Sequence, residues 1–458
     1  MSISRDIFRT YDIRGIYGEE LTGETAKIIG KASGTYFLQN QLRSVVVGMD
    51  NRVSSPLVFE AFCKGLLEVG CDVLDAGLSQ SPLIYYSWYG FDANAAVMVT
   101  ASHNPSQYNG FKISMNKKPL SGDDYQKIYQ ICLRDKFVEG TGQRQKIDLW
   151  SKYKEEIKKN IKLQKKLKVV VDCGNGGAAA FAPELLKELG CEVIPIYCEL
   201  DGRFPNHDPY PQKVEYYTEL IKTIKEQGAD IGLSFDGDGD RLGVYDEKGN
   251  FVENDRLAMI FTEDICLKHP HPKIVMNIST SLSVIEHIEN CGGNLILWKT
   301  GYPNITEKMR EEEAIFGGEI SGHFFFRDRY FGYDDALYAS FRALEIISAS
   351  NESFSSLIEK LPKYFETRET RVEVPEGKDK FAITKKIAEE IKKEHPEARI
   401  YDFDGIRFDF GDAWGLIRPS NTEPVIGTRA EAKSASGLEE VKNLIKDKLK
   451  KYEVNLSW

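Results

Sequence analysis

Short runs of β-branched residues recur along the chain, and each is followed by a helical pattern. The runs that share this form are Ser44–Asp50 (SVVVGMD), Lys168–Gly174 (KVVVDCG) and Lys273–Ser279 (KIVMNIS). An apolar run that ends in polar or glycine positions is typical of a strand buried on both faces of a parallel sheet. Three such strands, well separated along the chain, predict a repeated unit.

Each of these strands is followed by a second strand that a cysteine introduces, and then by a third that an alanine introduces. The second strands are Cys71–Leu78, Cys191–Cys198 and Cys291–Gly301, and the third begin at Ala93, Ala229 and Ala314. Strands that alternate with helices predict α/β domains with mainly parallel sheets covered on both faces. Ligands bind such sheets beyond the carboxyl ends of strands, and in every repeat the loop richest in polar groups follows the third strand. We therefore expect these three loops to converge on one cleft.

The chain from about Lys363 onward has a different pattern. Residues 367–377 and 400–420 alternate apolar and polar positions, as half-exposed antiparallel strands do, and helical patterns cover 381–393 and 438–451. This region is predicted to be an α+β domain. The expected domains are residues 1–150, 151–253 and 254–365, which are α/β, and 366–458, which is α+β.

Composition narrows the class of protein. The 458 residues are 41% hydrophobic and 28% charged, with a net charge of −10, which is ordinary for a globular chain and disfavours a dedicated nucleic-acid surface. The eight cysteines form no Cys-x-x-Cys pair, so neither a zinc framework nor a disulfide scaffold is expected. The N-terminus is charged, and no apolar run approaches the roughly 18–20 residues of a membrane span. We expect a cytoplasmic protein with no membrane partner.

The clearest chemical motif is SFDGDGDR, which places Asp236, Asp238 and Asp240 at the end of a predicted strand. Alternate carboxylates separated by glycine suit a hard divalent cation, and three carboxylates this close repel one another without one. An EF-hand loop is an alternative, because Glu247 falls at its twelfth position. Its sixth position, where a glycine must turn the chain, is Arg241 here. A solvated acidic turn is the other alternative. We expect one Mg²⁺, acting on a phosphate oxygen.

Three further loops carry groups that suit a sugar phosphate. TASHNP offers Ser102, which would carry a phosphoryl group beside the cation, although SHNP alone is also compatible with an Asx turn. GGEISGH offers Glu319, Ser321 and His323. The Glu319 carboxylate suits two neighbouring sugar hydroxyls, although Glu319 and His323 are also compatible with surface polar residues at the end of a strand. RPSNTEP joins Arg418 to two hydroxyls and an amide, a set that suits a phosphate, although an ordinary turn beside a surface arginine is the alternative.

Together these motifs, in the order TASHNP, DGDGDR, GEISGH and RPSNTEP, resemble those of the α-D-phosphohexomutase superfamily, and in particular of its phosphomannomutase/phosphoglucomutase branch. YDIRG and the Asp50-x-Arg52 pattern are also similar. The resemblance implies a heart-shaped enzyme of four domains around a central cleft. It implies reversible phosphoryl transfer between C1 and C6 of mannose or glucose phosphates, through phosphoserine and a bisphosphorylated sugar, with glucose 1,6-bisphosphate or a similar compound as activator. The partners would be small sugar phosphates, and the enzyme a monomer or dimer.

The resemblance also assigns roles to individual residues. Ser102 would be the phosphoserine and would hold Mg²⁺ together with Asp236, Asp238 and Asp240. The groups that would supply proton transfer and charge are Arg14, His103, Lys112 and His323. The residues that would bind substrate are Arg241, Thr300, Gly301, Tyr302, Glu319, Ser321, Arg418, Ser420, Asn421 and Thr422.

Two positions depart from the family pattern. Tyr302 stands where dual-specificity members tend to have histidine, and Ser279 where lysine is frequent. A tyrosine does not carry a histidine's charge near neutral pH, so one ligand contact is expected to differ. Phosphoglucosamine mutases have a similar sugar loop and are the alternative activity, and a sugar phosphatase that forms phosphoserine is another.

Overall fold

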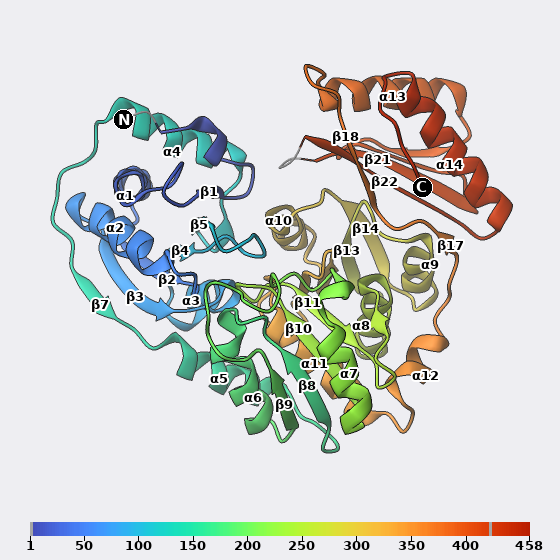
Figure 1. The fold of residues 1–458 in the computed structure, drawn as a ribbon, viewed down its shortest axis with the longest axis horizontal. Helices are drawn as coiled ribbons and strands as arrows, with labels where there is room; N and C mark the ends of the chain where they lie inside the picture. The colour runs from blue at the N-terminus through green and yellow to red at the C-terminus, as the bar shows by residue number, and fades with distance from the viewer. Residues whose placement is uncertain (1–2, 421–423) are drawn as a thin grey trace. The chain divides into compact units, whose positions relative to one another are not determined.

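The computed structural model describes residues 3–420 and 424–458. By its internal contacts the chain divides into two compact units. Unit 1 is Met1–Asn254 with Ser321–Glu359, and unit 2 is Asp255–Ile320 with Lys360–Trp458. Figure 1 shows the ribbon of both, coloured along the chain.

The N-terminal sheet of unit 1 is mixed. Its strands in spatial order are β1 (Ile13–Ile16), β5 (Tyr108–Met115), β4 (Ala95–Val99), β2 (Ser44–Met49), β3 (Asp72–Leu78) and β7 (Arg144–Lys146), with β6 (Lys118–Pro119) paired to β5. β2 runs parallel to β3 and β4, whereas β5 returns antiparallel to β4. The buried run Ala95–Val99 therefore ends at the same edge of the sheet as the parallel strands β2 and β3.

Helices cover this sheet, and two glycines let a pair of them approach closely. The helical segments are η1 (Arg5–Ile7), α1 (Gly23–Gln39), α2 (Ser55–Glu68), α3 (Ser81–Gly90), α4 (Gly122–Arg134) and α5 (Leu149–Asn160). A Cβ on Gly30 of α1 would lie 2.3 Å from the Phe62 carbonyl oxygen, and one on Gly65 of α2 would lie 2.3 Å from that of Lys27. Only glycine permits this contact between the two backbones.

The second sheet of unit 1 repeats the same local order. Its strands in spatial order are β12 (Phe251–Val252), β11 (Leu242–Tyr245), β10 (Ile231–Phe235), β8 (Lys168–Asp172) and β9 (Glu192–Ile196). β8 is parallel to β9 and β10, and β11 returns antiparallel to β10. The remaining elements of unit 1 are η2 (Gly177–Ala180), α6 (Ala182–Glu188), η3 (Val214–Tyr216), α7 (Thr218–Gln227), β16 (Phe324–Phe326), α11 (Ala336–Ala349) and α12 (Phe354–Glu359).

Unit 2 contains the third repeat. Its strands β14 (Asn294–Trp298), β13 (Lys273–Asn277) and β15 (Phe316–Gly318) lie in that order and are parallel. Its helices are α8 (Asn254–Lys268), α9 (Leu282–Asn290) and α10 (Tyr302–Glu312). In all three repeats the first strand lies between the second and the third, so the predicted repeat is confirmed at the level of topology.

The C-terminal sheet of unit 2 is antiparallel, as the alternating pattern predicts. Its order is β17 (Phe365–Glu366), β22 (Val425–Ala432), β21 (Ala413–Pro419), β20 (Ile406–Asp409) and β19 (Arg399–Tyr401), and β18 (Thr370–Glu373) also pairs with β22. Helices α13 (Lys380–Glu394) and α14 (Ala435–Lys450) bury apolar faces with this sheet, in a core that includes Ile387, Ile417 and Ile445. The predicted combination of three α/β modules and a C-terminal α+β domain is confirmed.

Buried polar contacts join the C-terminal sheet to the loop after β13. Arg407 donates to the carbonyl oxygens of Ile278 and Thr280, and Glu431 accepts from the backbone N–H of Leu282. Trp414 donates to the same carboxylate at 2.8 Å. These bonds satisfy buried groups at the N-terminus of α9 and fix two parts of unit 2 to each other.

Among the residues that the structure describes, none of the helices combines the length and the apolar character that crossing a bilayer would require.

Candidate active site

Ser102 lies in the loop after β4 with a left-handed backbone, at φ 52°, and is 2% exposed. Its N–H donates to Thr100 Oγ1 at 2.9 Å, and its own Oγ donates to Asp236 Oδ2 at 2.9 Å. Few non-glycine residues adopt this conformation, and those that do cluster at functional sites. The loop thus aims the Ser102 hydroxyl at the first aspartate of the acidic motif.

His103 contacts its neighbour: its Nδ1 lies 3.1 Å from Ser102 Oγ. Alternation of side chains along a strand gives no reason to expect this contact, and it forms because Ser102 has left the strand. The ring of His103 also packs on that of Tyr210, with centroids 4.7 Å apart. Desolvation, followed by the charges of Arg241 and Arg14, lowers the pKa of His103 well below its usual range. The imidazole is therefore neutral near pH 7.

The three aspartates of the acidic loop are fully buried between β10 and β11. Asp236 Oδ1 accepts from the N–H groups of Asp240 and Arg241, at 3.0 and 3.1 Å. Lys112, on β5, donates to Asp238 Oδ2 at 2.7 Å and to Asp240 Oδ2. Gly237 makes the approach of the two loops possible, since a Cβ there would lie 2.5 Å from the Ser102 carbonyl oxygen.

The acidic loop fits a divalent cation. Ligand oxygens of all three aspartates lie within 4.8 Å of one another. Among the described residues, Asp238 Oδ1 and Asp240 Oδ1 have no hydrogen-bond partner although they are buried. Burial and then the charges of Asp240 and Asp238 raise the pKa of Asp236 well above its usual range, which is the repulsion that a cation relieves. Unpartnered buried carboxylate oxygens are what a hard cation requires.

The residues of the acidic loop do not form the EF-hand that was the alternative. Glu247 accepts from the backbone N–H and the hydroxyl of Ser355, at the start of α12, and so is engaged elsewhere in unit 1. A strand leads into the loop, where an EF-hand has a helix. Of the carboxylates that the EF-hand alternative required, Glu247 is therefore excluded, and the three alternate aspartates remain as candidate ligands.

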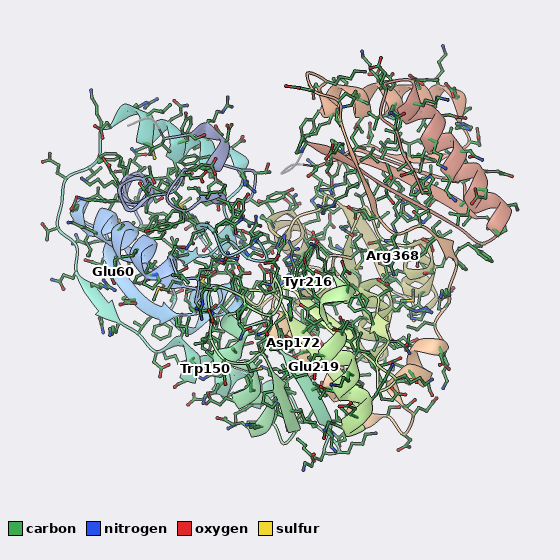
Figure 2. The ribbon with its side chains drawn as sticks, viewed as in Figure 1. Glu60, Trp150, Asp172, Tyr216, Glu219 and Arg368 are labelled. Carbon is green, nitrogen blue, oxygen red and sulfur yellow. The ribbon has the colours of Figure 1, made fainter. Side chains whose placement is uncertain are left out.

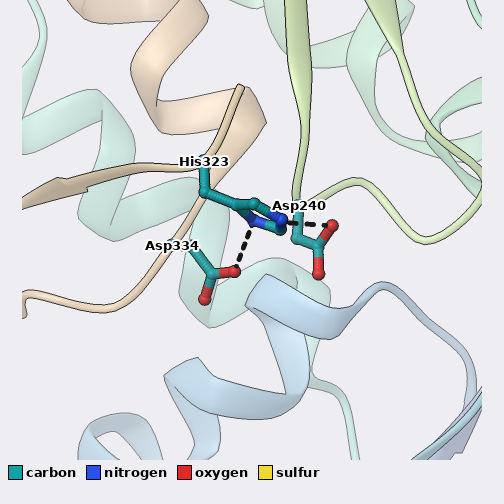
Figure 3. A group of neighbouring side chains, drawn as sticks. All are labelled: Asp240, His323 and Asp334. Carbon is teal, nitrogen blue, oxygen red and sulfur yellow. Dashed lines mark hydrogen bonds and ion pairs between the residues drawn. The ribbon is translucent and has the colours of Figure 1, made fainter. Parts of the chain in front are cut away.

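Arg241 and His323 form one arrangement with Asp334, part of which is drawn in Figure 3. Arg241 Nε donates to His323 Nε2 at 3.0 Å, and His323 Nδ1 lies 2.9 Å from Asp334 Oδ2. Asp240, His323 and Asp334 also have the spacing of a metal site. Both ring nitrogens of His323 are engaged, however, so this group holds the guanidinium rather than a second cation.

Tyr210 is a site residue that no sequence motif indicated. The guanidinium carbon of Arg241 lies 5.8 Å from the centroid of its ring, which also contacts His103. The loop that carries Tyr210 is attached to β8, since His207 Nε2 lies 3.3 Å from Asp172 Oδ1; Asp172 is labelled in Figure 2. Nothing local in the sequence marks Tyr210, because its neighbours come from other parts of unit 1.

Arg14 belongs to the same unit. It lies on β1, paired with Gly110 of β5, and its Nη1 donates to Asn104 Oδ1 at 2.5 Å while Nη2 donates to Asp12. Unit 1 thus brings together Ser102 and these other predicted residues: His103, Lys112, Arg14, Arg241, His323 and the three aspartates. Ser321 also lies in unit 1.

Unit 2 groups most of the remaining predicted residues around two carboxylates. Glu319, which is 3% exposed, accepts from the Gly301 N–H at 2.6 Å. Asp404 accepts from the Thr300 N–H and from Arg418 Nε, both at 2.9 Å. Tyr302, 7% exposed, begins α10. Asp404 links the predicted sugar and phosphate residues, although no sequence motif indicates it.

The RPSNTEP loop is described in part. Arg418 lies near the end of β21, and the Ser420 N–H donates to the Val425 carbonyl oxygen at 3.0 Å across the loop. Asn421 and Thr422, predicted to bind substrate, lie outside the described residues.

Asp335, at the start of α11 in unit 1, makes the stability of the folded protein depend on pH in a testable way. It caps α11 by accepting from the Tyr338 N–H, and it accepts from the hydroxyls of Tyr330 and Tyr153. Burial raises the pKa of Asp335 to about 7, against 3.8 for the unburied group, although these hydrogen bonds act to lower it. Between pH 3.8 and about 7, the Asp335 carboxyl is ionised in the unfolded chain but protonated in the folded chain. This carboxyl therefore favours folding fully below about pH 4, and its contribution is lost as the pH rises through 7.

We expect Asp335→Asn to gain stability relative to the wild type as the pH rises from about 4 to about 7, by up to about 1.4 kcal/mol per pH unit. Urea unfolding of both proteins at pH 5 and pH 7 measures the difference. A difference that does not change with pH would show that Asp335 ionises normally.

Comparison with known proteins identifies the family. Residues 5–139, 151–249 and 253–365 match the phosphoglucomutase/phosphomannomutase α/β/α domains I, II and III, and residues 369–448 match the C-terminal domain of the same proteins. The chain belongs to the phosphoglucomutase/phosphomannomutase family. Its members are isomerases that transfer a phosphoryl group between C1 and C6 of hexose phosphates, and the family is Mg²⁺-dependent. The buried acidic cluster of this chain agrees with that requirement.

Individual relatives of this family member are similar over the whole chain. The phosphomannomutase/phosphoglucomutase of Pseudomonas putida is 41% identical, over 98% of this chain and 96% of its own length. The phosphoglucomutase of Neisseria gonorrhoeae is 38% identical, over 97% of both. The crystal structure of a phosphoglucomutase/phosphomannomutase family protein from Burkholderia thailandensis superposes with a TM-score of 0.92 at 34% identity, covering 100% of each chain.

Proposed function

We propose that this phosphohexomutase interconverts the 1- and 6-phosphates of mannose, of glucose or of both, and that Ser102 carries the phosphoryl group between them. The observation that supports the proposal most is the 2.9 Å contact between Ser102 Oγ and Asp236 Oδ2, which places the hydroxyl of the TASHNP motif against the first aspartate of the DGDGDR motif. A hydroxyl beside a cation site is suited to store a phosphoryl group reversibly.

The reaction balances as two transfers. In the first, the sugar hydroxyl at C1 or C6 attacks phosphoserine; the bond between phosphorus and Ser102 Oγ breaks, a bond to the sugar oxygen forms, and the hydroxyl proton leaves to a base. The product is a bisphosphorylated sugar, which turns end for end. In the second, Ser102 Oγ attacks the other phosphoryl group of this sugar; the bond between phosphorus and the sugar oxygen breaks, a bond to Oγ forms, and the serine proton passes by way of a base to the departing sugar oxygen. Glucose 1,6-bisphosphate would restore phosphoserine by this same second transfer, which makes it the expected activator.

The chain's own residues offset charge at the transferring group. Asp236, Asp238 and Asp240 would hold Mg²⁺ with an oxygen of phosphoserine, and the cation when bound neutralises charge on the phosphoryl oxygens. Lys112 is buried beside Asp238 and Asp240 and supplies a further positive charge. His323 fixes Arg241 through Nε2, with Asp334 on its other nitrogen, so we assign His323 to the orientation of Arg241.

The remaining predicted residues would bind the sugar phosphate. Glu319 would contact sugar hydroxyls, with Thr300, Gly301 and Tyr302 beside it, and Ser321 would also contact a sugar hydroxyl. Arg418 and Ser420 would grip the phosphate that is not transferred, together with Asn421 and Thr422. We place the enzyme in the cytoplasm as a monomer or dimer acting on small sugar phosphates, without nucleic-acid or membrane partners; the cysteines, which are free in the described chain, agree with a reducing compartment.

A substrate panel tests the activity. The 1-phosphates of mannose, glucose, glucosamine and N-acetylglucosamine are supplied with Mg²⁺ and glucose 1,6-bisphosphate, and sugar 6-phosphate and free phosphate are measured separately. We expect 6-phosphate from mannose or glucose 1-phosphate, with little free phosphate. Turnover confined to the amino sugar phosphates would contradict the proposed substrates and indicate a phosphoglucosamine mutase. Stoichiometric release of phosphate would indicate a phosphatase.

A further inference from the structure

Arg52 is a fully buried arginine. All its side-chain N–H donors bond either to the segment 102–108 or to Asp50, which supports that segment. It lies between β2 and α2 and is 1% exposed. Its Nη2 donates to the carbonyl oxygens of Ser102 and Asn104, both at 2.7 Å, and its Nη1 donates to those of Pro105 and Tyr108, at 2.7 and 3.1 Å. Its Nε donates to an Asp50 oxygen at 3.0 Å. A guanidinium has five N–H donors, and these contacts use all five.

We infer that Arg52 is the positioning residue of the phosphoryl-carrying loop: its guanidinium holds four carbonyl groups of residues 102–108 and thereby keeps the Ser102 hydroxyl aimed at Asp236. The inference rests on the proposed function, because it concerns the same serine. From sequence alone, the Asp50-x-Arg52 pattern is only a point of resemblance to the family and carries no assigned role.

The backbone of the loop explains why such a group is needed. Residues 102–107 leave β4 and form no sheet ladder, so their inward carbonyl groups require donors from elsewhere. Ser102 also has the uncommon φ of 52°, a conformation that persists only where its surroundings impose it. A planar fork of fixed donors imposes such a path, whereas the lysine ammonium, with three donors on a flexible stem, does not.

Asp50 extends the support to the other side of Ser102. Its carboxylate, 2% exposed, accepts from Arg52 Nε, Arg52 N–H and the hydroxyls of Ser55 and Thr100. Thr100 Oγ1 in turn accepts from the Ser102 N–H at 2.9 Å. Ser102 is thus held through its N–H by way of Thr100 and through its carbonyl oxygen by Arg52. The Phe204 ring covers the guanidinium, with its centroid 5.1 Å from Cζ.

The test compares Arg52→Lys with Arg342→Lys. Arg342 is a matched control, because it is equally buried and ion-paired, with Nη1 2.7 Å from Asp328 Oδ1, but lies on α11. Steady-state kinetics and melting temperature are measured for both, and intact mass follows phosphate on Ser102 after incubation with glucose 1,6-bisphosphate and Mg²⁺. We expect Arg52→Lys to lower kcat by about 10²-fold, as a displacement of about 1 Å typically does, with KM near the wild-type value. Phosphate should reach Ser102 correspondingly slowly.

The melting temperature of the control variant Arg342→Lys should fall to a similar extent, while its kcat should equal that of the wild type. Equal kcat in Arg52→Lys and wild type, or equal losses in both lysine variants, would overturn the inference. If Arg52→Lys does not fold, Thr100→Val removes two bonds of the same support, the one that Thr100 Oγ1 donates to Asp50 and the one that it accepts from the Ser102 N–H. Its kcat should fall by roughly tenfold or more, since tenfold is about the equivalent of one hydrogen bond; an unchanged kcat there would also overturn the inference. A wild type that takes no phosphate on Ser102 would instead refute the proposed function, so the two failures are distinguishable.

Discussion

Replacing Ser102 by alanine is expected to lower mutase turnover by about a thousandfold or more, because no oxygen remains to form the bond to phosphorus. The variant should fold, since it loses only the contacts of Oγ with Asp236 and His103, while the bond from its N–H to Thr100 is made by the backbone. Coupled assay of sugar 6-phosphate measures the rate, and intact mass after incubation with glucose 1,6-bisphosphate should show no added phosphate.

Ser106→Ala is the control for this experiment, because Ser106 belongs to the same loop and has no place in the proposed site. It should keep both its turnover and its capacity to accept phosphate. A Ser102→Ala protein that turned over at the wild-type rate, or that still gained one phosphate per chain, would refute the assignment of the carrier.

Asp238→Asn is expected to abolish most of the Mg²⁺-dependent activity. The amide oxygen can replace Asp238 Oδ2 as acceptor for Ser81 Oγ and Lys112, which leaves an NH₂ group where the unpartnered Oδ1 now lies. An NH₂ group does not bind a cation. The affinity for Mg²⁺ should fall by at least the ~10–100-fold that loss of an outer partner alone typically costs. Titration calorimetry with Mg²⁺ measures the affinity, and activity against Mg²⁺ concentration gives an independent value.

Glu247→Gln serves as the matched control, because this residue would be the last ligand of an EF-hand and instead binds Ser355. Its Mg²⁺ affinity should equal that of the wild type. Loss of binding in Glu247→Gln with none in Asp238→Asn would place the cation elsewhere and remove the acidic loop from the mechanism.

Several features of the fold and the site were predictable from sequence because their signal is local. A buried parallel strand is an unbroken apolar run, so the strands beginning at Ser44, Lys168 and Lys273 stand out. Alternate aspartates and glycines after such a strand indicate a cation site, and the structure places Asp236, Asp238 and Asp240 together and buried.

Other residues of the site carry no local signal. Asp334 and Tyr210 lie in ordinary polar segments, and only the folded chain places one on His323 and the other on His103. The contact between His103 and Ser102 depends on a backbone angle that no side-chain pattern reveals. Asp404 joins Thr300 to Arg418. Thr300 is more than a hundred positions away in the sequence and Arg418 lies on β21, so no local pattern marks Asp404.

Local sequence patterns are enough to identify which strands are buried, their repetition, and which loops carry carboxylates, hydroxyls and guanidinium groups, because solvent exclusion and turn chemistry act over a few neighbouring residues. The groups that support these loops come from distant segments, so they become evident only in the folded chain. Arg52 is an unremarkable arginine in the chain, and it becomes the donor to four carbonyl groups because β2 and β4 are neighbours in the sheet. A buried polar group must bond to a partner that the fold places beside it, and no single segment of the sequence identifies that partner.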